Sequence, residues 1–160
     1  MNLLVTAPSW AIWALALLLA IATVQDASQL RISNLLSGGV LVLAIVVAVI
    51  VGPQLSLWQN GVAFAAVLAI GTLMFARGML GGGDVKLFAA ITAWTAGIMA
   101  LRLIAAILLC GGALAILILV ARAFAPESWG KRVRILGRRE GIPYGVAITA
   151  GTFLLLLLQR

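Results

Sequence analysis

The chain has 160 residues, of which 64% are apolar and only 9% are charged, against about 45–50% and about 25% in an ordinary globular protein. A protein this small cannot hide so much apolar side chain from water, because a large share of its residues must lie at the surface. The composition excludes a soluble domain and predicts an all-α, polytopic membrane protein, with one membrane-embedded domain over residues 1–160.

The residue types that hold metals and disulfides are almost missing. The chain has no histidine and a single cysteine, Cys110. This excludes disulfide frameworks, paired redox cysteines and Cys/His zinc sites, and we expect neither a metal nor a cofactor. The net charge of +7 would suit nucleic acid, but the basic residues have no soluble domain to carry them. We therefore expect contact with membrane lipid and none with nucleic acid.

Six apolar runs have the length of a membrane span or come close to it, since a span takes about 20 residues. They cover residues 7–24, 35–51, 57–76, 85–101, 103–121 and 142–158. Arg102 is predicted to mark the turn between the fourth run and the fifth. The fourth run is the weakest prediction, because it is short and contains Gly97. A cleaved signal peptide is not expected, because no lysine or arginine precedes the first run.

The basic residues predict the orientation. Eight of them fall in the connections between spans one and two, three and four, and five and six, and Lys86 lies at the same edge, whereas the other side holds only Arg102 and Arg160. Positively charged connections face the cytoplasm, so both termini are predicted outside and the basic loop 122–141 inside. The protein is expected in the bacterial cytoplasmic membrane.

Acids are scarce, and two of the four stand out. Besides Glu127 and Glu140 in the basic loop, the chain has only Asp26 and Asp84, and the predicted topology places both at the cytoplasmic membrane edge. Singly, each reads as an ordinary loop residue or a helix cap. Together they suggest a shared site. At a separation of about 5 Å their repulsion would be about 3 kcal/mol, so that the pair would share one proton near neutral pH, as in aspartic proteases.

Three glycines precede Asp84 and give the run Gly81-Gly82-Gly83-Asp84-Val85-Lys86-Leu87. Glycine lets another chain approach the backbone closely, which would leave room for an extended substrate; a flexible linker is the plainer interpretation. The run resembles the Gly-x-Gly-Asp signature of the type IV prepilin peptidases. Asp26-x4-Arg31-Ile32-Ser33-Asn34 is similar to the first-aspartate motif of that family, and Pro143-Tyr144-Gly145 to the start of its last helix.

The resemblance implies an aspartic endopeptidase that removes the leader of prepilins or pseudopilins at the cytoplasmic face, with Asp26 and Asp84 as the catalytic pair. Residues that would shape the site or bind substrate are Gly81, Gly83, Lys86, Arg31 and Asn34. The short length is similar to members that serve Flp/Tad-type pili. Longer members carry a cysteine-rich insert and methylate the new N-terminus, so cleavage without methylation is expected here. Ser33 stands where the family usually has proline.

Two other classes of function remain open at this stage. A small proton-coupled transporter would also use intramembrane acids, but we would expect them at mid-span. A non-enzymatic assembly scaffold would give no reason for two isolated aspartates on one side. For Lys86 and Arg31, an effect on the site and simple contact with lipid phosphates are equally compatible with the sequence.

Overall fold

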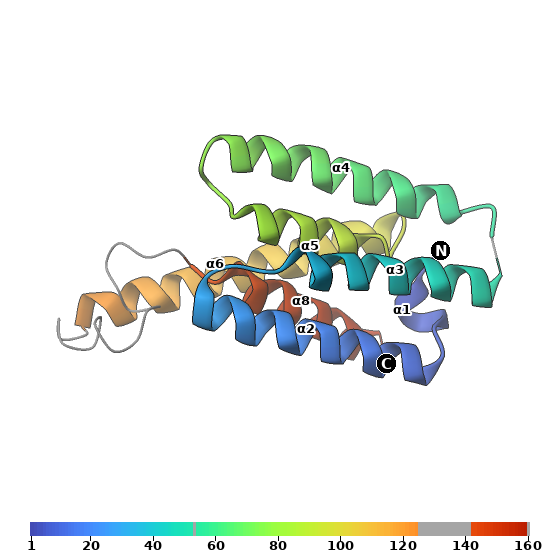
Figure 1. Cartoon of the computed structure of the whole chain (residues 1–160), viewed down its shortest axis with the longest axis horizontal. Helices are drawn as coiled ribbons and strands as arrows, with labels where there is room; N and C mark the ends of the chain where they lie inside the picture. The colour runs from blue at the N-terminus through green and yellow to red at the C-terminus, as the bar shows by residue number, and fades with distance from the viewer. Residues whose placement is uncertain (53, 125–141, 160) are drawn as a thin grey trace.

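The computed structural model describes residues 1–52, 54–124 and 142–159 and contains only helices there. In chain order (Figure 1) the helices are α1 (Leu3–Thr6), α2 (Ser9–Gln29), α3 (Asn34–Val51), α4 (Leu57–Ala76), α5 (Gly82–Thr92), α6 (Ile98–Phe124) and α8 (Tyr144–Leu158). Four of them, α2, α3, α4 and α6, are long and apolar enough to cross a membrane. The prediction of an all-α, multi-pass membrane protein is therefore confirmed.

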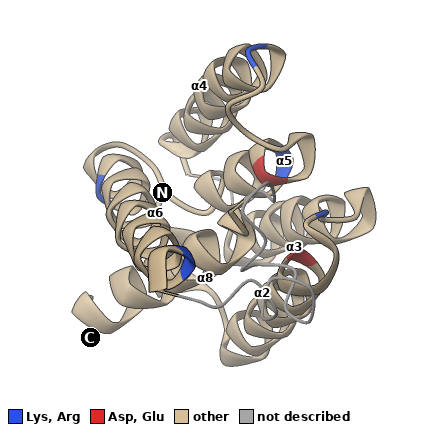
Figure 2. Ribbon diagram, turned by 90° about the vertical axis from the view of Figure 1, so that its left-hand side faces the viewer, with Lys and Arg blue, Asp and Glu red and all other residues tan. Residues whose placement is uncertain are grey.

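The helices form a bundle around α5 (Figure 2), which contacts α3, α4, α6 and α8. Helix α8 packs against both α2 and α6, whereas α4 lies at the edge and packs chiefly on α5. The largest fully buried side chains include Trp94, Leu15, Leu19, Leu87, Ile91, Leu103, Ile107 and Ile148. Large apolar side chains also cover the outer faces, for example Leu17, Val49 and Leu109, as expected where the surrounding solvent is lipid.

The fourth predicted span, 85–101, is corrected by the structure. Helix α5 begins earlier, at Gly82, and ends at Thr92 after 11 residues. A helix of this length measures about 16 Å, short of the roughly 30 Å of a hydrocarbon core. The turn lies before Ile98, with Gly97 at a φ of 56°, and not at Arg102, which lies within α6. Glycine adopts this left-handed conformation without strain. Gly97, which made the fourth span the weakest prediction, therefore lies in the turn between α5 and α6.

A helix that stops inside a membrane protein needs partners for its last carbonyls, and α5 finds them inside the fold. The backbone N–H of Leu3 donates to the carbonyl of Trp94 (2.8 Å). The side-chain amide of Asn60 donates to the carbonyl of Ala93 (2.9 Å). Asn60 is itself buried. Helix α1 and a side chain of α4 thus donate hydrogen bonds to carbonyl groups that a further turn of α5 would otherwise have satisfied.

The two ends of the bundle carry different connections and different exposed side chains. Connections α2–α3 and α4–α5, together with the facing ends of α6 and α8, lie at one end (Figure 1). Trp10, Trp13 and Trp58 are exposed near the first residues of α2 and α4, at the opposite end, where tryptophans of a membrane interface are expected. Residues 125–141, which make up most of the predicted basic loop, lie outside the described residues.

The other five predicted ranges coincide with α2, α3, α4, α6 and α8 to within five residues, but α8 has 15 residues and is shorter than the four candidate spans. The first span was predicted to end at residue 24, but α2 continues to Gln29 and ends at Leu30, which has a φ of 53°. Asp26 therefore lies on a helix and not in a connection.

Trp94 generates a prediction about stability. Its indole is fully buried and donates to the carbonyl of Val40 in α3 (3.2 Å). We expect Trp94→Ala to lower the free energy of unfolding by about 3–5 kcal/mol, because it opens a large cavity. Trp94→Phe should cost less, since it keeps most of the packing and loses one hydrogen bond. Thermal unfolding in detergent measures both. Trp13→Ala, at a side chain that is 76% exposed, is the matched control and should change little.

Candidate active site

A cavity of about 440 Å³ opens at the end of the bundle that carries the short connections. Its walls come from the last turn of α2, the α4–α5 turn, the first turns of α5 and α8, and the end of α6. The lining residues are Asp26, Leu30, Gly78, Met79, Leu80, Gly81, Asp84, Arg122, Ile142 and Tyr144. Both aspartates that the sequence singled out thus line one cavity, although they are 58 positions apart in the chain.

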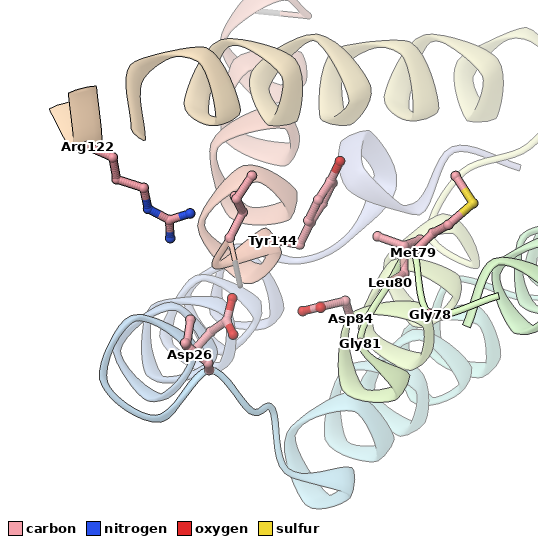
Figure 3. A pocket seen from close by; sticks show the side chains of 10 residues that line it. Asp26, Gly78, Met79, Leu80, Gly81, Asp84, Arg122 and Tyr144 are labelled. Atoms are coloured by element: carbon pink, nitrogen blue, oxygen red, sulfur yellow. The ribbon is translucent and has the colours of Figure 1, made fainter. Parts of the chain in front are cut away.

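Asp26 projects from the end of α2 and is only 2% exposed. Figure 3 shows it facing Asp84 across the cavity. Its Oδ2 accepts a hydrogen bond of 2.6 Å from the backbone N–H of Gly145, in the first turn of α8. The first N–H groups of a helix have no partner within the helix and favour negative charge, so this contact stabilises a carboxylate that is almost wholly withdrawn from water.

Asp84 is the third residue of α5 and is half-buried. Burial, and next the neighbouring charge of Asp26, raise the pKa of Asp84 to about 7, although a hydrogen bond from the backbone N–H of Gly81 opposes the shift. The carboxyl therefore holds its proton into the neutral range. The two acids therefore interact electrostatically across the cavity.

The segment after α2 holds the two acids in place. The side chain of Gln25 accepts a hydrogen bond from the backbone N–H of Ser33 (2.9 Å). Ile32, which is buried, lies directly against Gly83. A Cβ at Gly83 would lie 2.8 Å from the carbonyl oxygen of Ile32, so only glycine lets α5 begin this close to the connection that follows Asp26.

The other predicted site residues fall into two groups. Gly81 lines the cavity, and the side chain of Lys86 donates to Asn34 Oδ1 (2.8 Å), which joins α5 to the start of α3. The contact is exposed and lies beside the cavity, since neither residue lines it. Arg31 is exposed and also does not line the cavity. Their predicted roles in substrate binding stay predictions.

The sequence did not identify several residues at the site, among them Tyr144 and Arg122, which line the cavity, and Gly145, which contacts Asp26. The sequence places Gly145 only at the start of the last helix, and its contact with Asp26 joins positions 119 apart, which no local pattern reveals. Tyr144 has its ring beside Gly111 of α6, and Arg122 extends from the end of α6 toward the cavity (Figure 3). A signal for Tyr144 and Gly145 was present in the run Pro143-Tyr144-Gly145, but it indicated a helix start and no contact.

The two carboxyl groups that line the cavity are suited to acid–base catalysis. Among the described residues there is no group of three or more histidines, cysteines or acids that could hold a metal ion. Two carboxyl groups that share a proton can act together: one takes a proton from a water molecule and the other gives a proton to a leaving group. The surrounding Leu30, Met79, Leu80 and Ile142 provide an apolar wall that limits the access of bulk water.

Comparison with known proteins adds one match. The model of the type IV leader peptidase family matches residues 13–125, which include both aspartates and end before α8. Neither the curated proteins nor the solved structures contain a match.

The raised pKa of Asp84 predicts how stability changes with pH. An acid with a higher pKa in the folded protein binds more protons there than in the unfolded chain. Stability should therefore fall as the pH rises from about 4 to about 7, by about 1.4 kcal/mol for each unit of pKa difference. Asp84→Asn removes the ionisable group and therefore this loss of stability. The measurement is the unfolding temperature of the variant minus that of the unmodified protein, in detergent. We expect this difference to be larger at pH 8 than at pH 5; an equal difference at both pH values would contradict the prediction.

Proposed function

The chain belongs to the type IV leader peptidase family, and from this premise we propose that it is an integral-membrane aspartic endopeptidase that cleaves the leader from Flp/Tad-type prepilins or pseudopilins at the cytoplasmic face. Membership makes the protein a peptidase of the membrane. The finer proposal is carried by one observation: Asp26 and Asp84 line the same cavity at the end of the bundle.

The chemistry follows from a pair of acids with one proton between them. The ionised carboxyl takes a proton from a water molecule, whose oxygen attacks the carbonyl carbon of the scissile peptide. The protonated carboxyl hydrogen-bonds to the carbonyl oxygen and later gives a proton to the leaving amine. The products are a shortened pilin with a new amino terminus and a free leader, with one water consumed.

The position of the cavity supports a substrate that arrives from the aqueous side of the membrane. It lies where α2 ends and α5 begins, and not half-way along a spanning helix. Arg31, Arg77, Lys86 and Arg122 belong to the same end of the bundle. Since positive charge is retained on the cytoplasmic side, the proposal places the site there.

The first experiment tests catalysis. We expect Asp26→Asn and Asp84→Asn each to abolish cleavage of a co-expressed Flp-type prepilin, because an amide neither accepts the proton of water nor gives one to the amine. The double variant should be no worse than either single one, since the two acids act as a unit. The size of the pilin on a gel reports cleavage, and its mass should show no added methyl group.

Glu127→Gln and Glu140→Gln, which remove the only other acids of the chain, are matched controls and should retain activity. An Asp84→Asn protein that is inserted in the membrane and still processes prepilin at a near-normal rate would overturn the proposal.

The second experiment tests the orientation, in a Cys110→Ser background. Arg77 lies at the cavity end, whereas Leu55 is 99% exposed in the connection between α3 and α4, at the other end. In intact cells, a membrane-impermeant maleimide should label Leu55→Cys, and should label Arg77→Cys only after the cells are opened. Labelling of Arg77→Cys from outside would place the cavity on the wrong side of the membrane for this function.

A further inference from the structure

The first turn of α8 makes a direct hydrogen bond to one of the two acids. Helix α8 begins at Tyr144, after Pro143, and its second residue directs the Gly145 N–H at Asp26. At 2.6 Å, with Asp26 only 2% exposed, this is a short hydrogen bond in a site with little access for water. A buried carboxylate without such a donor would be costly to keep charged, whereas a helix N-terminus favours the charge.

Gly145 is suited to this contact because it lacks a side chain. A Cβ at this position would lie 2.9 Å from Oδ2 of Asp26 and 3.0 Å from its Cβ. It would also lie 3.0 Å from Cδ1 of Ile32. All three neighbours belong to α2 or to the connection after it, so even alanine would push α8 away from Asp26.

A second polar contact fixes α8 along α2 at the depth of the preceding turn. Thr23 and Thr149 lie three residues before Asp26 and four residues after Gly145, and therefore on the same helix faces. Their hydroxyl oxygens are 2.8 Å apart. Both also lie within hydrogen-bond distance of the carbonyl of Leu19, at 2.9 Å and 3.3 Å. In an apolar surrounding such a polar cluster resists sliding of one helix along the other.

Titratable or charged side chains from three neighbouring helices line the cavity together with Asp26. Asp84 comes from α5, Arg122 from α6 and Tyr144 from α8, and α3 carries no charged residue. Among the described residues that line the cavity, Asp84 is the only other acid, and it holds its proton into the neutral range because its pKa is raised to about 7. The backbone N–H of Gly145 donates to Asp26 and not to Asp84, and a helix N-terminus favours negative charge, so in a pair that shares one proton the charge falls on Asp26.

We propose that the first turn of α8 is a positioning element: the Gly145 N–H, held in register by Thr149, keeps Asp26 ionised and directed at Asp84. Asp26 is then the base that takes the proton of water, and Asp84 is the acid that serves the leaving amine. The division into base and acid rests on the proposed function. The ionised state of Asp26 does not, because it can be measured without a substrate.

The test uses infrared difference spectra of the purified full chain between pH 4 and pH 8. Asp26→Asn and Asp84→Asn identify the band of each carboxyl. In the unmodified protein, we expect Asp84 to lose its proton near neutral pH and Asp26 to lose its proton at a lower pH than Asp84. Thr149→Val should raise the pH at which Asp26 loses its proton, by at most about one pH unit, which is the effect of losing one backbone donor. Thr149→Ser, which keeps the hydroxyl, should return this pH to its value in the unmodified protein. Gly145→Ala should shift it at least as far as Thr149→Val.

Matched controls separate this role from general packing. Thr152 lies on the same helix, but its hydroxyl bonds to the carbonyl of Ile148 in α8 itself, so Thr152→Val should leave the titration of Asp26 unchanged. Gly112→Ala adds a methyl group where nothing lies within 4 Å and should also have no effect. An Asp26 that carries the proton at pH 6 while Asp84 is ionised would overturn the proposal. So would unchanged titration in both Thr149→Val and Gly145→Ala.

Cleavage provides the second readout. For a Flp-type prepilin, the acid limb of the pH profile of kcat/KM should move to higher pH in Thr149→Val, in step with the infrared titration, and return in Thr149→Ser. A merely structural effect would lower activity at every pH without moving the limb, and would count against the proposal. If the unmodified protein does not cleave the prepilin, the proposed function fails, while the infrared result still decides the state of Asp26.

Discussion

The close approach of three backbone segments at one end of the bundle is the constraint on which the site depends. Asp26 and Asp84 belong to different helices, and each meets a neighbouring segment at a glycine. Gly145 brings α8 against Asp26, and Gly83 brings the start of α5 against Ile32. At either position a Cβ would lie 3.0 Å or less from an atom across the contact. These two contacts set the distance between α2, α5 and α8, and therefore the width of the cavity between the acids.

This arrangement has a cost that the rest of the fold offsets. Helix α5 places Asp84 at its first turn, which fixes where the helix begins, but its 11 residues cannot reach the other end of the bundle. Its last carbonyls are completed by Leu3 and Asn60, and Trp94 closes the space next to α3. These contacts lie far from the acids and are needed because α5, the central helix, is short. Substitution of Trp94 should therefore disturb the acids indirectly, through the position of α5.

The sequence revealed the membrane class, most helix positions and the two acids, because each of these leaves a local signal. Apolar runs mark the spans, and two aspartates in a nearly acid-free chain are conspicuous. The contact of Lys86 with Asn34 joined two residues that the motifs had selected separately. Arg31, selected in the same way, is exposed and does not line the cavity. Motif membership alone does not say which side chains face the cavity, since that depends on how the helices are rotated.

What the sequence could not reveal are the contacts between distant segments and the ends of helices set by packing. The Gly145 N–H bonds to a carboxylate 119 positions away, and a backbone donor has no signature in side-chain chemistry. The apolar pattern continues past Thr92, where α5 ends, so hydropathy extended the fourth span through the turn that contains the buried Trp94 and Gly97. In the same way, α2 continues past its apolar run to Gln29, and Asp26 in its last turn accepts a hydrogen bond from the first turn of α8.

The position of the acids also bears on the choice between a peptidase and a proton-coupled transporter. A transporter needs groups that meet each side of the membrane in turn, and it places its acids near the middle of the spans. Here Asp26 lies three residues before the end of α2, and Asp84 is the third residue of α5. Below them the bundle is filled by Leu19, Leu87, Ile91 and Ile107, which are essentially inaccessible. A polar path through this core would need several large side chains to move apart, whereas hydrolysis needs water and an extended peptide at one end only. The described core therefore favours a reaction at one face of the membrane over passage through it.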